Sequence, residues 1–210
     1  MKDIFKQSGC IGILGGTFNP VHIGHIMLAD KTIEQYPDIE KIVIMPNNLP
    51  AYKNAHELVD SKHRIRMLEL ATEDRDYVSI SDLEIKRGGA TYTIDTLREI
   101  KNINPSLKIY FIIGADSLFQ FEKWREHKEI LRLCTLLAAR RDSDYDKMSE
   151  CARQIISDTG YGEIGFIKAP SVDAASSEIR KTIAGGSIPY DILPEGVAEY
   201  IAVNKLYRQD

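Results

Sequence analysis

Residues 10–25 read CIGILGGTFNPVHIGH, an apolar run that passes through two glycines into a turn containing two histidines. The run Cys10–Leu14 is short and apolar and ends in turn-forming residues, which is typical of a buried strand. Gly15 and Gly16 allow a ligand to approach backbone N–H groups closely, and a helix beginning near Gly24 would direct its positive end to the same place. The stretch therefore predicts a first strand followed by an anion-binding turn.

The same alternation of short apolar runs and helical segments continues along the whole chain. Strands are expected at Cys10–Leu14, Lys41–Met45, Val78–Ser81, Ile109–Ile113, Thr135–Ala139 and Ile164–Ile167. Helices are expected to begin near Gly24, Lys62, Thr93, Ser117, Asp144 and Ser177, with a last one after Pro194. This order predicts an α/β fold with a Rossmann-like open, mostly parallel sheet and helices on both faces. Ligands of such sheets bind outside the carboxyl ends of the strands.

Length and composition predict one globular domain. The chain has 210 residues, of which 43% are hydrophobic and 28% charged, which is ordinary for a protein with a buried core. We expect residues 1–210 to form a single domain. Its C-terminal helical part, about residues 171–210, is expected to pack on the rest and to carry a second phosphate motif.

Charge and cysteine content narrow the classes of partner and compartment. The net charge of −4 gives no overall field that would draw the chain to nucleic acid or anionic lipid. The three cysteines form no CxxC pair, which favours a reducing compartment. Neither a signal-peptide core nor an apolar run of about 20 residues is found. We expect a cytoplasmic protein with no nucleic-acid or membrane partner, and self-association into a homo-oligomer stays open.

The turn after the first strand fits neither of the two common phosphate-binding loops. A Walker A loop needs Lys and then Ser or Thr after its last glycine, whereas Gly24 is followed by His25. A dinucleotide fingerprint needs GxGxxG, and the glycines of residues 12–16 are spaced differently. His22 and His25 should share one face of the first helical turn, where imidazoles of ordinary pKa, about 6.5, can be protonated beside a phosphate. The alternative interpretation is a tight turn with packed histidines.

A second candidate phosphate motif lies near the C-terminus, where residues 174–180 read AASSEIR. Ser176 or Ser177 is expected to cap the following helix, whose free N–H groups would form another anion site. Arg180, one turn along, offers a planar fork for phosphate oxygens. Taken alone, the segment is more typical of a capped surface helix with a solvated arginine, and only its pairing with the first motif favours a phosphate site.

Together, the two stretches resemble the HxGH nucleotidyltransferase superfamily, whose members transfer a nucleoside monophosphate from a nucleoside triphosphate and release pyrophosphate. The segment His22–His25 (HIGH) is similar to the signature that gives the superfamily its name, and Ala174–Arg180 is similar to its serine-rich second signature. The resemblance implies a nucleotidyltransferase fold in which both segments hold one triphosphate.

Further stretches resemble one branch, the bacterial nicotinate-nucleotide adenylyltransferases. They are Pro50–Lys53 (PAYK), Arg64–Ala71 (RIRMLELA), Glu84–Leu97 (EIKRGGATYTIDTL), Ile112–Asp116 (IIGAD) with Trp124 downstream, and Arg140. The resemblance implies that AMP is transferred from ATP to nicotinate mononucleotide, which gives nicotinate adenine dinucleotide (deamido-NAD) and pyrophosphate in NAD biosynthesis.

The resemblance also implies a set of site residues. The catalytic residues are expected to be His22, His25, Lys53 and Arg180. ATP is expected to bind Gly15, Gly16, Thr17, Phe18, His22, His25, Gly114, Asp116, Ser177 and Arg180. Nicotinate mononucleotide is expected to bind Gly16, Asn19, Lys53, Thr93, Asp116, Trp124 and Arg140. Mg²⁺ is expected to arrive with ATP, bound to phosphate oxygens and water, with no protein side chain as a metal ligand.

Four residues depart from the family pattern. Asn19 stands where many members have Asp, Tyr52 replaces a His, Ala175 replaces a Ser, and Arg141 replaces a Pro. The departures put substrate affinity and loop geometry in question, but His22, His25 and Arg180 are present.

Several alternatives stay open. One is a catalytically silent nucleotide sensor of the same fold. Others are a preference for nicotinamide mononucleotide, or the chemistry of phosphopantetheine or glycerol-phosphate nucleotidyltransferases. An RNA-binding role is weaker, because no basic face with interleaved aromatic residues is found.

Overall fold

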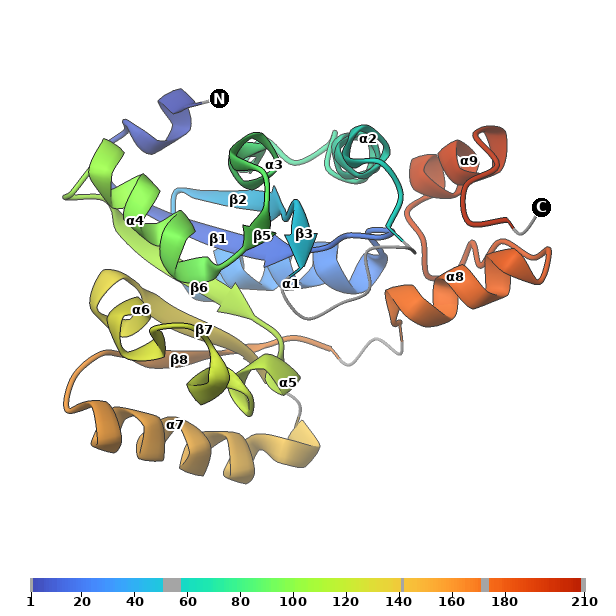
Figure 1. Cartoon of the computed structure of the whole chain (residues 1–210). Helices are drawn as coiled ribbons and strands as arrows, with labels where there is room; N and C mark the ends of the chain where they lie inside the picture. Colours follow the sequence, from blue (N-terminus) through green and yellow to red (C-terminus); the bar gives the residue numbers. More distant parts are fainter. Residues whose placement is uncertain (1, 51–57, 141, 171–173, 209–210) are drawn as a thin grey trace.

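The centre of the computed structural model, which describes residues 2–50, 58–140, 142–170 and 174–208, is a six-stranded parallel sheet (Figure 1). From edge to edge its strands are β4 (Val78–Ile80), β2 (Lys41–Pro46), β1 (Cys10–Gly16), β6 (Lys108–Ile113), β7 (Thr135–Arg140) and β8 (Ile164–Lys168). From β1 the chain adds β2 and then β4 toward one edge of the sheet. It then returns to the other side of β1 and adds β6, β7 and β8 toward the opposite edge. The order of the strands therefore reverses between β1 and β6, which is where open α/β sheets bind their ligands.

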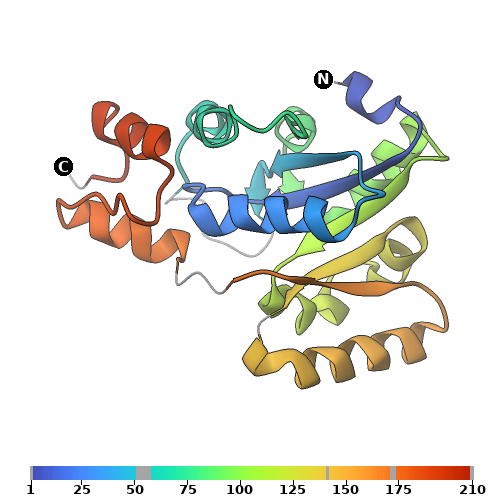
Figure 2. The same cartoon turned by 180° about the vertical axis from the view of Figure 1, so that it is seen from behind.

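Helices cover both faces of the sheet (Figures 1 and 2). One face is covered by α1 (Ile23–Gln35) and α2 (Ser61–Ala71), and the apolar cluster on this face continues into α8 (Ser176–Ala184) and α9 (Glu195–Val203), which lie at one end of the molecule. The other face is covered by α3 (Leu83–Arg87), α4 (Thr93–Ile103), α5 (Ala115–Leu118), α6 (His127–Leu133) and α7 (Tyr145–Thr159). Short 3₁₀ turns complete the described elements: η1 (Lys2–Phe5), η3 (Phe121–Lys123) and η4 (Asp142–Asp144). The predicted α/β fold with helices on both faces is confirmed.

Strand β1 shows why the first stretch of sequence decides this architecture. Ile11 and Ile13 enter the apolar cluster on one face, and Cys10 and Leu14 enter the cluster on the other. Full burial of such a side chain stabilises the fold by about 1.5–3 kcal/mol. A Cβ atom added at Gly12 would lie 2.7 Å from a methyl carbon of a β2 isoleucine, so glycine lets the strands and their side chains approach closely.

The predicted strands and helix starts agree with the structure to within about two residues at each end. The sequence did not predict α3 and α6, which have 5 and 7 residues. It also missed a separate parallel pair, β3 (Leu49–Pro50) with β5 (Ala90–Thr91). Elements this short contain too few side chains to show a hydrophobic period. In the described part of the chain, no helix combines the length and apolar character needed to cross a membrane.

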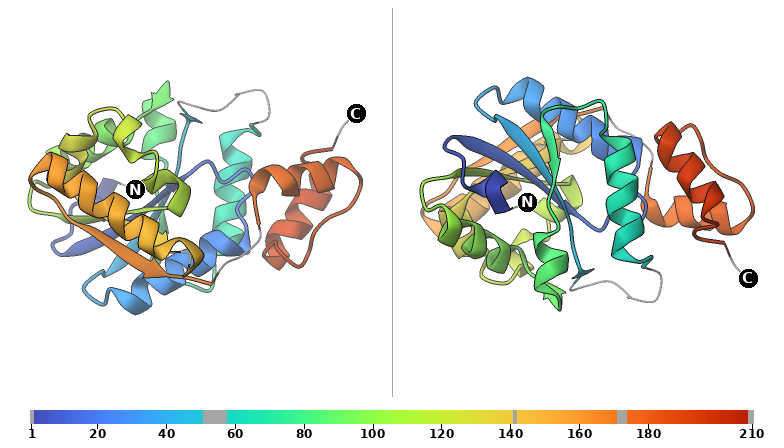
Figure 3. Two further views of the ribbon diagram at one scale, coloured as in Figure 1. Left: turned by 90° about the horizontal axis from the view of Figure 1, so that it is seen from below. Right: turned by 90° about the horizontal axis from the view of Figure 1, so that it is seen from above.

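The C-terminal helices α8 and α9 lie side by side at one end of the molecule (Figure 3). Ile179 and Ile183 of α8 are buried in the same apolar cluster as Phe18 and Val21, which follow β1. Helix α9 packs on α2, where Nδ1 of His63 lies 2.9 Å from the Tyr200 hydroxyl. These contacts bring the last part of the chain next to the turn after the first strand.

Candidate functional site

Two cavities open at the carboxyl ends of β1 and β6, where the strand order reverses. The larger, about 600 Å³, contains His22 and His25 and is called the histidine cavity. The smaller, about 340 Å³, contains Trp124 and is called the tryptophan cavity. Both are lined by residues 15–17 and by Ser117, so the two cavities adjoin at the end of β1.

The histidine cavity gathers residues from both ends of the chain. The described residues that line it are Gly15, Gly16, Thr17, Phe18, Asn19, His22, His25, Leu58, Ser117, Ala175, Ser176, Ser177 and Arg180. Hydrogen-bond donors predominate among the polar side chains of this set, which contains no carboxylate. The lining therefore suits a ligand rich in negatively charged oxygen atoms.

His22 and His25 are stacked at the start of α1. His22 is the N-cap, and the ring centroids of the two imidazoles are 3.8 Å apart. The backbone N–H of His22 donates to Nδ1 of His25 at 3.2 Å, which places the proton of neutral His25 on Nε2. Burial lowers the pKa of His22 to about 4, so this side chain is neutral at pH 7 in the ligand-free protein. The sequence-based expectation of a readily protonated imidazole therefore applies to His22 only when an anion adds its charge.

The glycine pair gives the turn its close packing. Phe18 has a positive φ of 49°, and its ring lies against Gly16, where an added Cβ atom would be 2.9 Å from a ring carbon. The Phe18 ring also makes an edge-to-face contact with the imidazole of His25, with the ring centroids 5.0 Å apart. Only glycine at position 16 permits this arrangement, which supports the imidazole of His25.

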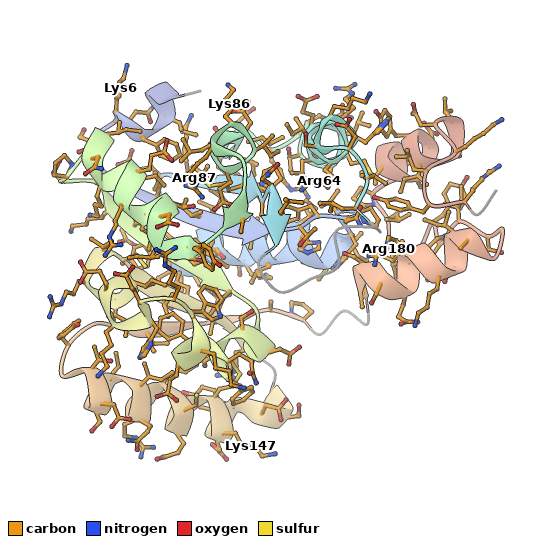
Figure 4. All side chains as sticks on the ribbon, viewed as in Figure 1. Lys6, Arg64, Lys86, Arg87, Lys147 and Arg180 are labelled. Atoms are coloured by element: carbon orange, nitrogen blue, oxygen red, sulfur yellow. The ribbon has the colours of Figure 1, made fainter. Side chains whose placement is uncertain are left out.

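Two hydrogen bonds join helix α8 to the turn after β1. Nη1 of Arg180 donates to the carbonyl oxygen of Asn19 at 3.1 Å, and the Ser176 hydroxyl donates to the carbonyl of Pro20 at 2.9 Å. Arg180 projects from α8 toward the start of α1 (Figure 4). The prediction that Ser176 or Ser177 is the N-cap was wrong. The N-cap is Ala175, because the Ser176 hydroxyl is engaged across the fold.

Asn19 joins three segments of the chain. Its Oδ1 accepts from the hydroxyl of Tyr207 at 3.1 Å and from the backbone N–H of Val59 at 3.3 Å, while its carbonyl accepts from Arg180. Asn19 is 4% exposed, so these bonds satisfy a buried polar group. The turn after β1 is thereby tied to the C-terminal segment and to the chain that leads into α2.

Arg64, on α2, is a buried cation beneath the turn. Its Nη1 donates to the carbonyl oxygens of Thr17 at 3.0 Å and Asn47 at 2.7 Å, and its Nε donates to Val59 at 3.3 Å. Only 1% of the residue is exposed, and burial lowers the pKa of its guanidinium. An arginine still carries its charge under these conditions, so Arg64 places positive charge directly below the loop that lines both cavities.

The tryptophan cavity is mainly aromatic and apolar. Its described lining is Gly15, Gly16, Thr17, Asn47, Glu84, Thr91, Tyr92, Thr93, Phe111, Ile112, Ile113, Gly114, Ser117, Trp124, Arg125 and Ile130. Trp124 is held by Phe111 and Phe121, at centroid distances of 6.3 and 5.6 Å. Helix α4 begins at Thr93, and the first N–H groups of a helix have no partner within it. The cavity thus combines flat apolar surfaces with a few donors, as sites for planar ligands do.

Two charged side chains belong to this cavity. Arg125 lies over the Tyr92 ring, 5.0 Å from its centroid, and forms an ion pair of 3.4 Å with Asp95. Glu84, on α3, is 5% exposed and accepts a hydrogen bond of 2.6 Å from the Thr96 hydroxyl. Burial raises the pKa of Glu84 to about 7.

The predicted site residues divide into three groups. Twelve line one or both cavities. Nine of them line the histidine cavity: Gly15, Gly16, Thr17, Phe18, Asn19, His22, His25, Ser177 and Arg180. The other three, Thr93, Gly114 and Trp124, line the tryptophan cavity. Asp116 is exposed on α5 and lines neither cavity, and Arg140 lies at the end of β7 with its guanidinium 4.3 Å from the Tyr145 ring centroid. Lys53 lies outside the described residues, as do Tyr52 and Arg141.

Several lining residues were not predicted from the sequence. Asn47 follows β2, Ser117 lies in the helix after β6, and Glu84 lies in the helix after β4. Inspection of every segment that follows a strand would have found all three, because such segments meet at one edge of a parallel sheet. Nothing comparable in the sequence marks Arg125 or the buried Arg64.

The described residues offer no protein cage for a metal ion. No group of three or more His, Cys, Asp or Glu side chains lies close enough together to hold one in residues 2–50, 58–140, 142–170 and 174–208. A magnesium ion that is bound mainly by substrate phosphates and water needs no such cage.

Comparisons with known proteins identify the family of the chain. A family model described as cytidylyltransferase-like matches residues 13–182. A probable nicotinate-nucleotide adenylyltransferase from Lachnoclostridium phytofermentans is 38% identical over 198 residues, which cover 94% of this chain and 98% of that protein. A second protein of the same description, from Lactococcus lactis subsp. lactis, is 35% identical over 199 residues and covers 95% of both chains.

Solved structures share the fold. The nicotinic acid mononucleotide adenylyltransferase of Plasmodium falciparum complexed with NaAD matches with a TM-score of 0.77 and 20% identity, over 95% of this chain and 97% of that chain. The same protein complexed with APC matches with a TM-score of 0.75. At this identity the likeness concerns the architecture, and it extends over nearly the whole chain.

Proposed function

This chain belongs to the cytidylyltransferase-like family, among the nicotinate-nucleotide adenylyltransferases, and we propose that it transfers AMP from ATP to nicotinate mononucleotide. The products are nicotinate adenine dinucleotide (deamido-NAD) and pyrophosphate, in NAD biosynthesis. One observation carries the proposal: His22, His25 and Arg180, from two distant motifs, line one cavity that adjoins the cavity of Trp124.

The reaction places two demands on the protein. The 5′-phosphate of the mononucleotide attacks the α-phosphorus of ATP, the new O–P bond forms, and the bond to the β-phosphate oxygen breaks. Both reactants are anions, so the protein must offset their repulsion and align them. Because the attacking phosphate is already ionised, no side chain needs to remove a proton from it.

We assign the triphosphate to the histidine cavity. The N–H groups of the turn, together with the imidazoles of His22 and His25 that stack at the start of α1, are assigned to the negative charge that builds up around the α-phosphorus. Ser177 and Arg180 bind the β- and γ-phosphates, which leave as pyrophosphate. Lys53, which lies outside the described residues, is assigned to the phosphate groups on the family resemblance. Thr17 and Phe18 contact the nucleotide beside them.

The mononucleotide is assigned to the tryptophan cavity. The indole of Trp124 stacks on the pyridine ring, and N–H groups at the start of α4, at Thr93, receive its carboxylate. An amide offers two hydrogens at one of its ends, so a site built from donors disfavours it. Neither Asp116, which is exposed, nor Arg140, which is half-buried, lines the cavity. Their assignment to the ribose and to the mononucleotide phosphate rests on the family resemblance.

Mg²⁺ fits the described donor set as a partner of ATP. The histidine cavity has no carboxylate among its described lining residues, so the ion would be held by phosphate oxygens and water. When bound, it neutralises charge on the phosphates that leave. Arg180 and Ser177, which line the same cavity, would bind these phosphates beside the ion.

An acceptor comparison tests the proposed function. Release of pyrophosphate from ATP and Mg²⁺ is measured with nicotinate mononucleotide, nicotinamide mononucleotide, phosphopantetheine or no acceptor. We expect the first acceptor to give the highest kcat/KM. Comparable rates with both pyridine nucleotides would overturn the specificity, and no turnover with any acceptor would favour a nucleotide sensor.

A further inference from the structure

A buried carboxyl group that the proposed reaction does not use lies in the tryptophan cavity. We propose that the protonation state of Glu84 determines whether this cavity favours a pyridine carboxylate or a pyridine amide. The inference deepens the proposed function and rests on the assignment of the mononucleotide to this cavity. It concerns substrate selection, and Glu84 has no part in the phosphoryl transfer.

The two oxygen atoms of Glu84 have different surroundings. Oε1 accepts the hydrogen bond of 2.6 Å from the Thr96 hydroxyl. Oε2 has no hydrogen-bond partner among the described residues, and it is not fully enclosed by the protein. Glu84 lines the cavity and its Oε1 is engaged by Thr96, so we infer that Oε2 is the oxygen that a ligand would meet.

Among the residues that the structure describes, no cation forms an ion pair with Glu84. Arg87 donates to the Thr96 oxygen at 2.8 Å and pairs with Glu99 at 3.2 Å, so its guanidinium faces α4 (Figure 4). Glu99 adds negative charge, and the other cation of the cavity, Arg125, is paired with Asp95. Asn47 is the neutral polar side chain that approaches from β2. Attraction from Arg87 opposes the effects of burial and of Glu99 on the pKa of Glu84, but burial is the largest of these effects and raises it to about 7.

The two protonation states present opposite chemistry to the ligand. A neutral carboxyl group donates a proton from Oε2 and can form a charge-assisted hydrogen bond with a carboxylate. An ionised carboxyl group repels that carboxylate, and it accepts instead from the N–H₂ of an amide. Raising the pH through the pKa of Glu84 should therefore shift the preference from the acid toward the amide.

The ratio of kcat/KM for nicotinate mononucleotide to that for nicotinamide mononucleotide, measured from pH 6 to 8.5, tests the inference. Both ligands carry the same 5′-phosphate, so titration of that phosphate and of His22 cancels in the ratio. We expect the ratio to fall about tenfold as Glu84 ionises. Glu84→Gln keeps the neutral form and should make the ratio independent of pH. Glu99→Gln, which changes the nearby carboxylate outside the cavity, should retain the decline.

If nicotinamide mononucleotide reacts too slowly for its kcat/KM to be measured, a binding measurement replaces the kinetic one. Trp124 is the only tryptophan of the chain, so its fluorescence gives the dissociation constant of each mononucleotide at each pH. Circular dichroism and thermal unfolding confirm that both variants fold. A ratio that does not change with pH in the unmodified protein, or that declines equally in Glu84→Gln, would overturn the inference while leaving the proposed function intact. Absence of binding and turnover with both mononucleotides would instead refute the proposed function.

Discussion

The two cavities meet at one loop but have contrasting chemistry. The histidine cavity offers donors from both ends of the chain and has no carboxylate among its described lining residues. The tryptophan cavity offers aromatic surfaces, a helix start and the buried carboxyl group of Glu84. The first suits phosphate oxygens, which need many donors, and the second suits a planar ring with one polar substituent. The contrast predicts that substitutions in each cavity affect one substrate much more than the other.

Replacing Arg180 is expected to have the largest effect. Arg180→Ala removes a preorganised donor from the leaving phosphates, so kcat should fall about 10²–10³-fold, while the affinity for the mononucleotide changes little. Steady-state kinetics with each substrate varied in turn measures both quantities. The exposed neighbour Lys181, which pairs with Glu178 at 2.8 Å, provides the control Lys181→Ala, and near-normal kinetics are expected for it. Equal losses in the two variants would contradict the assignment of Arg180.

Replacing Trp124 should have a smaller effect, and the effect should fall on the mononucleotide. Trp124→Ala removes the stacking surface, so KM for the mononucleotide should rise about tenfold while KM for ATP stays near its original value. Trp124→Phe should recover part of the loss. Phe119→Ala, at an exposed aromatic residue outside both cavities, serves as the control. A change in the KM for ATP alone would contradict this assignment and would place ATP in the tryptophan cavity.

Replacing Arg64 tests the element that the cavities share. Arg64→Met leaves the carbonyl oxygens of Thr17, Asn47 and Val59 without this donor, so the free energy of unfolding should fall by about 2–3 kcal/mol. Denaturant titration measures it. Arg66→Met, on the same helix with an exposed ion pair, should change stability by less than about 1 kcal/mol. Similar stabilities of the two variants would show that Arg64 does not support the loop.

The pH dependence of stability gives the smallest expected signal. The folded-state pKa of His22, about 4, lies below its unfolded value of about 6.5, so the unfolded chain binds this proton first. The contribution of neutral His22 to the free energy of unfolding is therefore present above about pH 6.5 and is lost as the pH falls toward 4. The stability of the unmodified protein relative to His22→Gln should decline over that window in denaturant titrations. A constant difference would contradict the burial of a neutral imidazole.

The contrast between the cavities also explains what the sequence could predict. The strands and the histidine motif were predictable because their signals are local: apolar runs, adjacent glycines and a fixed histidine spacing. The stacking of His22 on His25 follows from that spacing. Long-range contacts carry no such signal. The N-cap of α8 differs from the predicted one because Ser176 bonds to Pro20, and Glu84 looks like a surface residue until the fold buries it.

Positions within the tryptophan cavity were less predictable for the same reason. Trp124 was identified only through resemblance to a family, because a lone tryptophan in a sequence is more often a packing residue. Outside that cavity, Arg64 lies on a helix with ordinary amphipathic spacing, and only the fold turns its side chain toward three carbonyl groups. Local patterns thus revealed the strand-to-helix turn, and tertiary packing determined the rest.

A crystal structure with the dinucleotide product bound tests the central claim most directly. We predict that the pyridine ring stacks on Trp124 in the tryptophan cavity, that the bridging phosphates lie over residues 15–17, and that a phosphate donor set formed by His22, His25 and Arg180 faces them from the histidine cavity. A product that leaves either cavity empty, or that binds away from the turn after β1, would contradict the account.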